Sequence, residues 1–246
     1  MTIYRESIRN KVFIHQKIPY AFNWNIENHR QKISPLNPYR TEFIRLGKYF
    51  NRIYQGKIPH NLFNTRALPR VSRFKIIGLK SMFLRNFGKN LIKEGKIEYC
   101  DSNSKLPQYA QIVHTNFKNN GIITNPGHGP VLKYILIKDR DSLAIEVPIW
   151  KKAEGKALTG HIDLIQIQDN VIKIIDYKPE GNFMFSLPQV ATYGLLLKSV
   201  LKIENVKCVS FNKNNAWEFD PNILLTDVKD YLKMHNINER VWENYI

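Results

Sequence analysis

The sequence predicts an α/β protein, in which strands and helices form layers, preceded by a basic and mainly helical N-terminal region. Residues 106–246 alternate between two patterns, in the order helix, four strands, helix, strand, helix. Residues 1–105 contain two amphipathic stretches with helical spacing. The net charge also changes at this boundary, because nearly all of the excess positive charge lies in residues 1–105. We therefore expect two regions, 1–105 and 106–246.

In the first region, helices are expected where apolar residues recur at intervals of three and four. This pattern covers residues 39–54 and residues 73–93. The segment between them contains Pro59 and Pro69 and is typical of turns. Residues 1–38 are mixed and give no single pattern.

In the second region, the changes of period predict each element in turn. Residues 106–119 are expected to form a helix, and residues 121–130 a loop rich in glycine and proline. Pro188 suits the first turn of a later helix. The expected strands are 131–138, 142–150, 161–168, 171–177, 206–211 and 216–219, and the later helices are 187–201 and 222–235.

Composition excludes several classes of protein. No apolar run approaches the roughly 18–20 residues of a membrane span. The N-terminus is charged early and has no apolar core of a signal peptide, so we expect an intracellular protein that is not secreted. Cys100 and Cys208 are the two cysteines, too few for a four-cysteine zinc or iron–sulfur site. Both are expected to be ordinary thiols.

The net charge of +16 is concentrated in the first region. Residues 1–105 contain 21 Lys and Arg against 6 Asp and Glu, a net charge of +15. Residues 106–246 contain 16 against 15, a net charge of +1. This asymmetry indicates a polyanionic partner, with nucleic acid as the first candidate. The alternative is a basic, solvated surface with no specific partner.

Residues 160–178, GHIDLIQIQDNVIKIIDYK, predict two short strands joined by a turn at Asp169. Side chains alternate along a strand, so Asp176 and Lys178 point to the same side. If the strands pair as a hairpin, Asp163 reaches the same place. Such a cluster stabilises a fold little, because desolvating charges costs free energy, whereas a metal-dependent phosphodiester hydrolase uses it. The structural alternative is a surface hairpin with a salt bridge.

These groups suit a hard divalent cation. Asp163 and Asp176 offer carboxylate oxygens, the main-chain carbonyl of Tyr177 offers one more, and water completes the shell of Mg2+. Lys178 would orient the attacking water or stabilise developing negative charge. Glu146, an acid on the apolar stretch SLAIEVPIW, would be a third ligand, direct or through water, unless it pairs with a nearby lysine or arginine. The expected cofactor is Mg2+ or Mn2+.

Four short elements follow one another along the second region: A-Q-I-V-H at 110–114, G-H-I-D at 160–163, I-I-D-Y-K at 174–178 and Q-V-A-T-Y at 189–193. Their order and spacing resemble the RecB-type branch of the PD-(D/E)XK nucleases. The resemblance covers residues 106–212 and implies a restriction-endonuclease-like core, a central mixed sheet flanked by helices. Some members carry a four-cysteine iron–sulfur cluster, which this chain lacks the cysteines to form, so the cluster-free form is implied.

The resemblance also implies a role for each matching residue. The two aspartates would ligate the metal, Lys178 would be the catalytic lysine, and His114 would be an additional metal ligand or active-site group. Gln189 and Tyr193, four residues apart on one helix face, would line the site and position the DNA strand or the catalytic residues. The alternatives are a core histidine for His114 and a packing face for the other two. His128, in the loop GHGP, is a further candidate for contact with substrate.

Basic and aromatic residues interleave in the N-terminal region. Cations track phosphates, and aromatic rings stack unpaired bases at about 1–3 kcal/mol each. No sequence-reading module is evident, so recognition of the DNA backbone is expected. Alternatively the aromatic residues form the region's own core, which we favour for Phe43, Phe50 and Phe83. The residues expected to bind nucleic acid are Arg40, Arg45, Lys48, Arg52, Arg66, Arg70, Arg73, Lys75, Lys80, Arg85 and Lys89.

These observations predict a Mg2+- or Mn2+-dependent deoxyribonuclease in which a metal-activated water, assisted by Lys178, attacks phosphorus. By analogy with the family, we expect an exonuclease or structure-selective enzyme of DNA repair, recombination or replication, acting on single-stranded or branched DNA. Two alternatives stay open: a catalytically inactive DNA-binding module of the same fold, and a sequence-specific endonuclease. No phosphate-binding P-loop motif occurs, so no nucleotide cofactor is expected.

Overall fold

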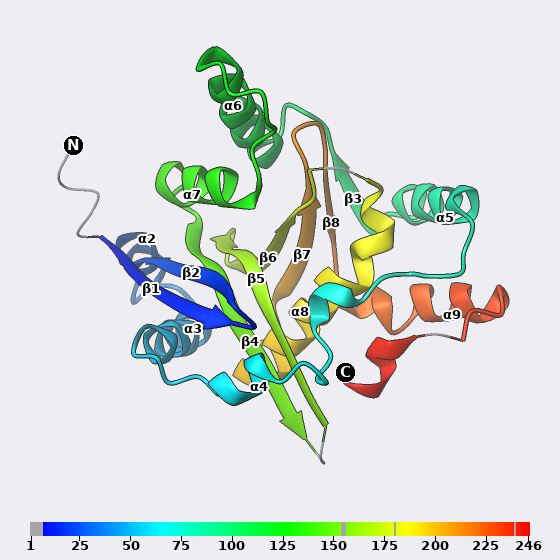
Figure 1. Ribbon diagram of the computed structural model, residues 1–246, viewed down its shortest axis with the longest axis horizontal. Coiled ribbons are helices and arrows are strands. Elements are labelled where there is room, and N and C mark those ends of the chain that lie inside the picture. Colours follow the sequence, from blue (N-terminus) through cyan, green and yellow to red (C-terminus); the bar gives the residue numbers. More distant parts are fainter. Residues whose placement is uncertain (1–6, 154–155, 180, 239) are drawn as a thin grey trace.

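The computed structural model describes residues 7–153, 156–179, 181–238 and 240–246, and within them an eight-stranded sheet forms the centre (Figure 1). The strands lie in the order β1-β2-β4-β5-β6-β7-β8-β3. Neighbours pair antiparallel except β6 and β7, which are parallel, so the sheet is mixed. The strands are β1 (Ile8–His15), β2 (Ile18–Asn25), β3 (Ile97–Cys100), β4 (Ser142–Ala153), β5 (Lys156–Gln168), β6 (Val171–Tyr177), β7 (Val206–Phe211) and β8 (Ala216–Phe219).

Helices flank the sheet on both faces. One hydrophobic cluster contains the buried residues of α3, α5 and α8, and a second contains those of α6 and α7. The expected α/β class, a mixed sheet flanked by helices, is therefore confirmed. The helices are α2 (Ile26–Lys32), α3 (Arg40–Tyr54), α4 (His60–Asn64), α5 (Ser81–Lys93), α6 (Lys105–Asn119), α7 (His128–Lys138), α8 (Phe183–Leu201) and α9 (Asp227–Met234), with short 3-10 turns at Val71–Arg73, Pro221–Leu224 and Val241–Asn244.

Helix α8 makes the parallel pairing possible. A parallel pair of strands needs a crossover of a dozen or more residues, and α8 supplies it between β6 and β7. The Asn182 side chain caps its start by accepting a hydrogen bond from the Met184 main-chain N–H at 3.0 Å. A Cβ at Gly194 would lie 2.6 Å from Cys208 Sγ, so this glycine lets α8 lie close against β7.

The N-terminal region belongs to the same sheet and the same core. β1 and β2 form a hairpin, β2 pairs with β4, and β3 pairs with β8, so residues before 105 supply both edges of the sheet. Phe22 and Leu84 lie in the same hydrophobic cluster as Leu187 of α8. The hairpin was not expected within the mixed segment 1–38. The boundary at residue 105 stays a prediction, but the sheet and the core cross it.

Three segments differ from the sequence prediction. The helix expected over 222–235 is divided into the 3-10 turn Pro221–Leu224 and α9, which begins at Asp227. The strand expected at residues 131–138 is wrong, because these residues form most of α7. A short, continuous apolar run fits either element by periodicity, and only packing against the sheet decides it here. The helix expected over 73–93 begins at Ser81, after a turn in which Gly78 has a φ of 84°.

The other predicted strands, and the helices at 39–54, 106–119 and 187–201, are confirmed to within a few residues at each end. Both cysteines are free thiols, with Cys208 buried and Cys100 partly exposed. In the described ranges, no helix combines the length and apolar character needed to cross a bilayer. The intracellular location stays a prediction.

Candidate functional site

β5 and β6 form the antiparallel hairpin that the sequence predicts. The turn is made by Asp169 and Asn170, whose φ angles of 50° and 64° lie in the left-handed region that two-residue hairpin turns require. From this turn the strands pair as far as Leu164 and Ile175. The turn therefore sets which residues of β5 and β6 lie opposite one another at the open end of the hairpin.

Two aspartates stand at that open end. Since Leu164 pairs with Ile175, the next residues on the two strands are Asp163 and Asp176. The main-chain N–H of Tyr177 donates a hydrogen bond to Asp163 Oδ2 at 3.0 Å. The hairpin thus brings together the two carboxyl groups that the sequence singles out.

Glu146 of β4 approaches the aspartates from the other side of β5. The cross-strand pairs on either side of Glu146 place it level with Asp163. Its φ angle is 52°, inside a strand, and a non-glycine residue in this conformation costs about 1–3 kcal/mol. Three acids therefore lie in one row across β4, β5 and β6, and backbone strain marks the first of them.

The three carboxyl groups hold their protons more tightly than free acids. Burial raises the pKa of Glu146, of Asp163 and of Asp176 to about 7 in each case. The neighbouring acid adds to this effect at both aspartates. The Lys178 ammonium, with Nζ 2.7 Å from Asp176 Oδ2, lowers the pKa of both aspartates and so opposes burial. One lysine acts on two of the three acids, so the row favours a further cation.

Gln189 of α8 connects the acid and the lysine. Its Nε2 donates a hydrogen bond to Asp176 Oδ1 at 3.0 Å, and its Oε1 accepts one from Lys178 Nζ at 3.3 Å. A single amide thereby orients both groups, since each end of the amide has one fixed role. The structure places Gln189 in the site, where the sequence resemblance expects it.

Tyr193, one turn further along α8, packs directly on Gly160 of β5. A Cβ at Gly160 would lie 2.5 Å from Tyr193 Cε1. Tyr193 is buried, which raises the pKa of its hydroxyl well above the ordinary value. Its ring therefore acts mainly as a packing contact between α8 and the strand that carries Asp163.

Glu146, Asp163, Lys178, Gln189 and Tyr193 line a pocket of about 290 Å³, and all five come from the predicted core. Asp176 is connected to this pocket through its contacts with Lys178 and Gln189. The rest of the lining comes from segments far away in the sequence, and its titratable or aromatic side chains are Tyr20, Arg70, Lys75, His128 and His161. Arg70 and Lys75 are the two predicted nucleic-acid-binding residues that reach the acids' pocket.

The structure brings His128 to the acids, and it places His114 elsewhere. His128, at the start of α7, has its Nε2 3.6 Å from Asp163 Oδ2. Burial lowers the pKa of His128, and the main chain of Tyr177 partly opposes this effect. His114 does not line the pocket, and its Nε2 lies 3.0 Å from the Tyr177 hydroxyl. His114 is therefore separate from the acids. The main-chain carbonyl of Tyr177, which is expected from the sequence to ligate a metal, lies beside the ring of His128.

Sequence reasoning missed a stack of rings at one wall of the pocket. His161 Nε2 lies 3.0 Å from His15 Nδ1, and the His161 ring stacks on Tyr20 with 3.8 Å between centroids. Burial lowers the pKa of His15 to about 4 and that of His161 well below its ordinary value, so both rings are neutral near pH 7. Only the β1–β2 hairpin brings His15 and Tyr20 here, and no local pattern signals it.

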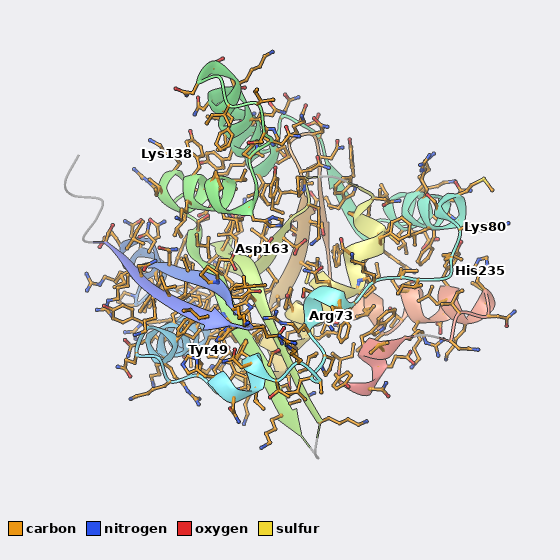
Figure 2. The ribbon with its side chains drawn as sticks, viewed as in Figure 1. Tyr49, Arg73, Lys80, Lys138, Asp163 and His235 are labelled. Atoms are coloured by element: carbon orange, nitrogen blue, oxygen red, sulfur yellow. The ribbon has the colours of Figure 1, made fainter. Side chains whose placement is uncertain are left out.

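The predicted nucleic-acid-binding residues fall into three groups. α3 packs beside β1 and α5 beside β3, at opposite edges of the sheet. In Figure 2, Asp163 lies near the middle of the molecule and Lys80 at its rim. Arg40, Arg45, Lys48 and Arg52 belong to α3, Lys80, Arg85 and Lys89 to the start and body of α5, and Arg66, Arg70, Arg73 and Lys75 to the segment between α4 and α5.

The donor set suits a hard divalent cation. Mg2+ in proteins takes oxygen ligands and is held by one or two carboxylates with water in the remaining positions. Among the described residues, no three His, Cys, Asp or Glu side chains gather closely enough to hold a metal ion. Two carboxylates would therefore hold the ion, and Asp163 and Asp176 are the pair at the open end of the hairpin. Glu146 would act through water.

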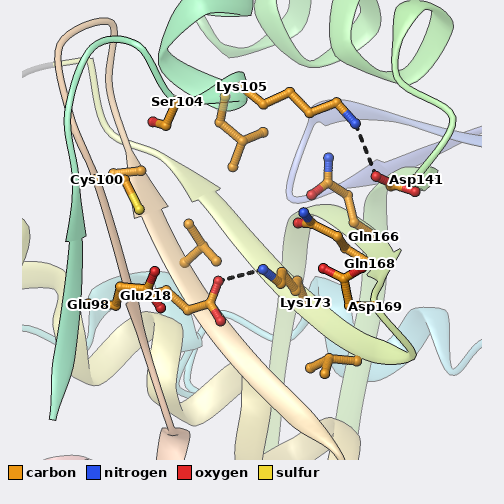
Figure 3. A pocket seen from close by; sticks show the side chains of 14 residues that line it. Glu98, Cys100, Ser104, Lys105, Asp141, Gln166, Gln168, Asp169, Lys173 and Glu218 are labelled. Atoms are coloured by element: carbon orange, nitrogen blue, oxygen red, sulfur yellow. Dashed lines mark hydrogen bonds and ion pairs between the residues drawn. The ribbon is translucent and has the colours of Figure 1, made fainter. Parts of the chain in front are cut away.

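A larger cavity, of about 420 Å³, lies elsewhere on the sheet and has a different character (Figure 3). Both of its lysines are paired with acids. Lys173 Nζ is 2.6 Å from Glu218 Oε2, and Lys105 Nζ is 3.0 Å from Asp141 Oδ2. The buried acids whose pKa values are raised to about 7 lie around Asp163 instead, so the pocket there is the candidate functional site.

Comparisons with known proteins add no relative. No protein-family model matches the chain, and neither a curated protein nor a solved structure matches it.

Proposed function

We propose that this protein is a divalent-metal-dependent nuclease that hydrolyses phosphodiester bonds in DNA. The proposal rests on the row of buried acids Glu146, Asp163 and Asp176, with Lys178 paired to the last. Carboxyl groups buried side by side destabilise a fold unless something compensates them. Strongly shifted acids that converge in a pocket are typical of active sites. We therefore assign these acids a catalytic role and not a stabilising one.

Each group in the pocket has a role in this reaction. Asp163 and Asp176 would hold Mg2+ or Mn2+, which supplies charge neutralisation and a bound water of lowered pKa. Lys178 stabilises negative charge that develops on the phosphate oxygens. Gln189 keeps Lys178 and Asp176 in their relative positions. Hydrolysis adds water across one P–O bond and leaves a phosphate monoester and a hydroxyl.

We also propose that the chain belongs to the RecB-type branch of the PD-(D/E)XK nucleases, with a restriction-endonuclease-like core and without an iron–sulfur cluster. The support is that the hairpin with Asp163 and Asp176 is followed by a crossover helix that turns Gln189 toward the acids. The mixed sheet, with β6 and β7 parallel, is compatible with it.

DNA is the proposed substrate because the excess positive charge lies in residues 1–105. The segment through Arg70 runs alongside β5, and the pocket beneath is only about 290 Å³. So small a pocket favours a single strand or a branched end over an intact duplex. We therefore favour an exonuclease or structure-selective enzyme that acts inside the cell in DNA repair, recombination or replication.

The direct test is Mg2+- or Mn2+-dependent cleavage of single-stranded and double-stranded DNA. Asp176→Asn keeps the shape of the side chain and removes its charge, so the expected result is loss of cleavage with the fold retained. Asp230→Ala, which removes an exposed acid of α9, is the matched control and keeps full activity. Equal cleavage by wild type and Asp176→Asn would overturn the proposal.

The same assay separates the remaining alternatives. Salt-sensitive DNA binding without turnover in Mn2+ indicates a binding module. Discrete fragments from a plasmid indicate a sequence-specific endonuclease, whereas progressive shortening from the ends indicates an exonuclease.

A further inference from the structure

Arg70 is a buried cation without an anionic partner. It is 8% exposed, and its Nη2 makes no hydrogen bond within the described part of the chain. None of the ion pairs among the described residues includes it. Its guanidinium carbon lies 5.7 Å from the centroid of the Tyr20 ring. An unpaired buried charge costs free energy, so the position calls for an anion.

The backbone holds Arg70 in this place. Arg70 forms a parallel β-bridge with Thr159, and the Thr159 N–H donates a hydrogen bond to the Pro69 carbonyl at 3.4 Å. The neighbouring Val71 and Phe74 are buried in the main hydrophobic cluster. The guanidinium is therefore fixed beside the strand of Asp163 before any ligand binds, which reduces the entropy lost on binding.

Two cavities meet at Arg70. It lines the acid pocket, and it also lines an apolar cavity of about 190 Å³. The side chains of that second cavity are those of Pro69, Arg73, Phe74, Lys75, Ile77, Val241 and Trp242. Trp242 is buried, and its indole Nε1 has no hydrogen-bond partner in the described residues.

The composition of the apolar cavity points to a nucleobase. Its volume is below the roughly 300–1,000 Å³ of pockets for drug-sized ligands, so it has room for one ring system. Phe74 and Trp242 give the cavity aromatic walls. Arg73 and Lys75 add positive charge at the same cavity.

We propose that Arg70 binds a phosphate of a single-stranded nucleic acid and that the apolar cavity takes the adjoining base. The next phosphodiester bond of that strand then lies in the acid pocket, on the other side of Arg70. The choice of nucleic acid as the ligand rests on the proposed nuclease function. The anion site at Arg70 rests on its own geometry.

The test measures binding without divalent metal, so it does not depend on cleavage. The probes are inorganic phosphate, deoxyadenosine 5′-monophosphate and a short single-stranded oligonucleotide. Arg70→Met is expected to weaken binding of all three, by about tenfold to a hundredfold for the oligonucleotide. Arg140→Met, an exposed arginine outside the set of predicted nucleic-acid-binding residues, is the control with little effect.

Thermal unfolding distinguishes a binding role from a structural one. Because Arg70→Met removes an unpaired buried charge, the free variant is expected to unfold at the same or a higher temperature than wild type. Phosphate raises the unfolding temperature of wild type and leaves that of the variant unchanged. A clear drop in the unfolding temperature together with unchanged binding would overturn the proposal.

A second variant tests the cavity for the base. Ile77, which is 59% exposed at the cavity, is replaced by tryptophan to fill the space, and Ile123→Trp is the control at an exposed position elsewhere. Ile77→Trp is expected to weaken the monophosphate and to leave inorganic phosphate unaffected. Equal weakening of both ligands, or of neither, would overturn the assignment of the base.

The oligonucleotide identifies which phosphate Arg70 takes. If removing a 5′-terminal phosphate abolishes the difference between wild type and Arg70→Met, the site binds a terminal phosphate. If the difference persists, it binds an internal phosphodiester, and both results support the anion site. Wild-type protein that binds these probes but never cleaves DNA would overturn the nuclease and keep the binding site.

Discussion

Gly160 and Tyr193 meet so closely that the fold has no room for a methyl group between them. A Cβ at Gly160 would lie 2.5 Å from Tyr193 Cε1 and 3.0 Å from its hydroxyl oxygen. The contact joins β5, which carries Asp163, to α8, which carries Gln189. Packing between these two residues therefore sets the distance between the acids and the amide that orients them.

Gly160→Ala is expected to destabilise the protein by about 1–3 kcal/mol, because the tyrosine ring or the strand has to move. The double variant Gly160→Ala/Tyr193→Leu is expected to lose less stability than the sum of the two single losses, because the smaller leucine side chain leaves space for the added methyl group. Urea unfolding measures both. Gly129→Ala, where a Cβ meets nothing within 4 Å, is the control. Wild-type stability of Gly160→Ala would contradict this packing.

The three buried acids of the site are expected to lower the free energy of unfolding as pH rises. Free carboxyl groups have pKa values of about 4, and burial raises the pKa of Glu146, Asp163 and Asp176 to about 7. Between these values the folded state binds more protons than the unfolded state, so this contribution is present near pH 4 and is lost as pH passes 7.

Thermal unfolding without divalent metal, measured from pH 5 to pH 8, checks this expectation. Asp176→Asn is expected to flatten the curve, because it removes one of the shifted groups. Adding Mg2+ is expected to stabilise wild type more at pH 8 than at pH 5, since the ion binds the charged carboxylates. Parallel curves for wild type and variant would contradict the assigned shifts.

Glu146 combines a strained backbone with a buried acid. Glu146→Gly relieves the left-handed φ of 52°, so it is expected to be about 1 kcal/mol more stable than Glu146→Gln, which keeps the strain. Both variants lose the carboxylate and are expected to lose DNA cleavage alike. Unfolding in urea and cleavage rates are the two measurements. Equal stability of the two variants would show that the strand is relaxed at this residue.

Gln189 and Lys178 act as one unit. Gln189→Ala is expected to lower kcat/KM about 10–100-fold, because it frees both groups that the amide orients. Lys178→Ala is expected to lower it about 100–1,000-fold. The double variant should lose little more than Lys178→Ala alone. Lys198→Ala, near the far end of α8, is the control with unchanged rate, and additive losses would argue against coupling.

His114 is expected to contribute to stability rather than to metal binding. Its Nε2 lies 3.0 Å from the Tyr177 hydroxyl, so His114→Ala and Tyr177→Phe each lose that hydrogen bond, worth about 1 kcal/mol. The Mg2+ concentration for half-maximal cleavage is expected to stay unchanged in His114→Ala. A higher Mg2+ concentration for half-maximal cleavage in His114→Ala would instead indicate that His114 takes part in metal binding.

Local patterns were enough to predict the centre of the site. A two-residue turn and strict alternation are properties of neighbouring residues, so the sequence predicts the hairpin that joins Asp163 to Asp176 and Lys178. The four-residue interval between Gln189 and Tyr193 works in the same way on a helix. Where a local pattern fits two elements, as in the apolar run 131–138, the prediction was wrong.

The sequence by itself determined the α/β class, the hairpin and the acids, because each depends on residues close together in the chain. The tertiary structure alone decided that Arg70, His128 and Tyr20 share a pocket with Glu146 and Asp163. These residues are far apart in sequence, and pairing between distant segments, such as Arg70 with Thr159, brings them together. Such long-range contacts depend on the packing of the whole chain, which no local spacing records.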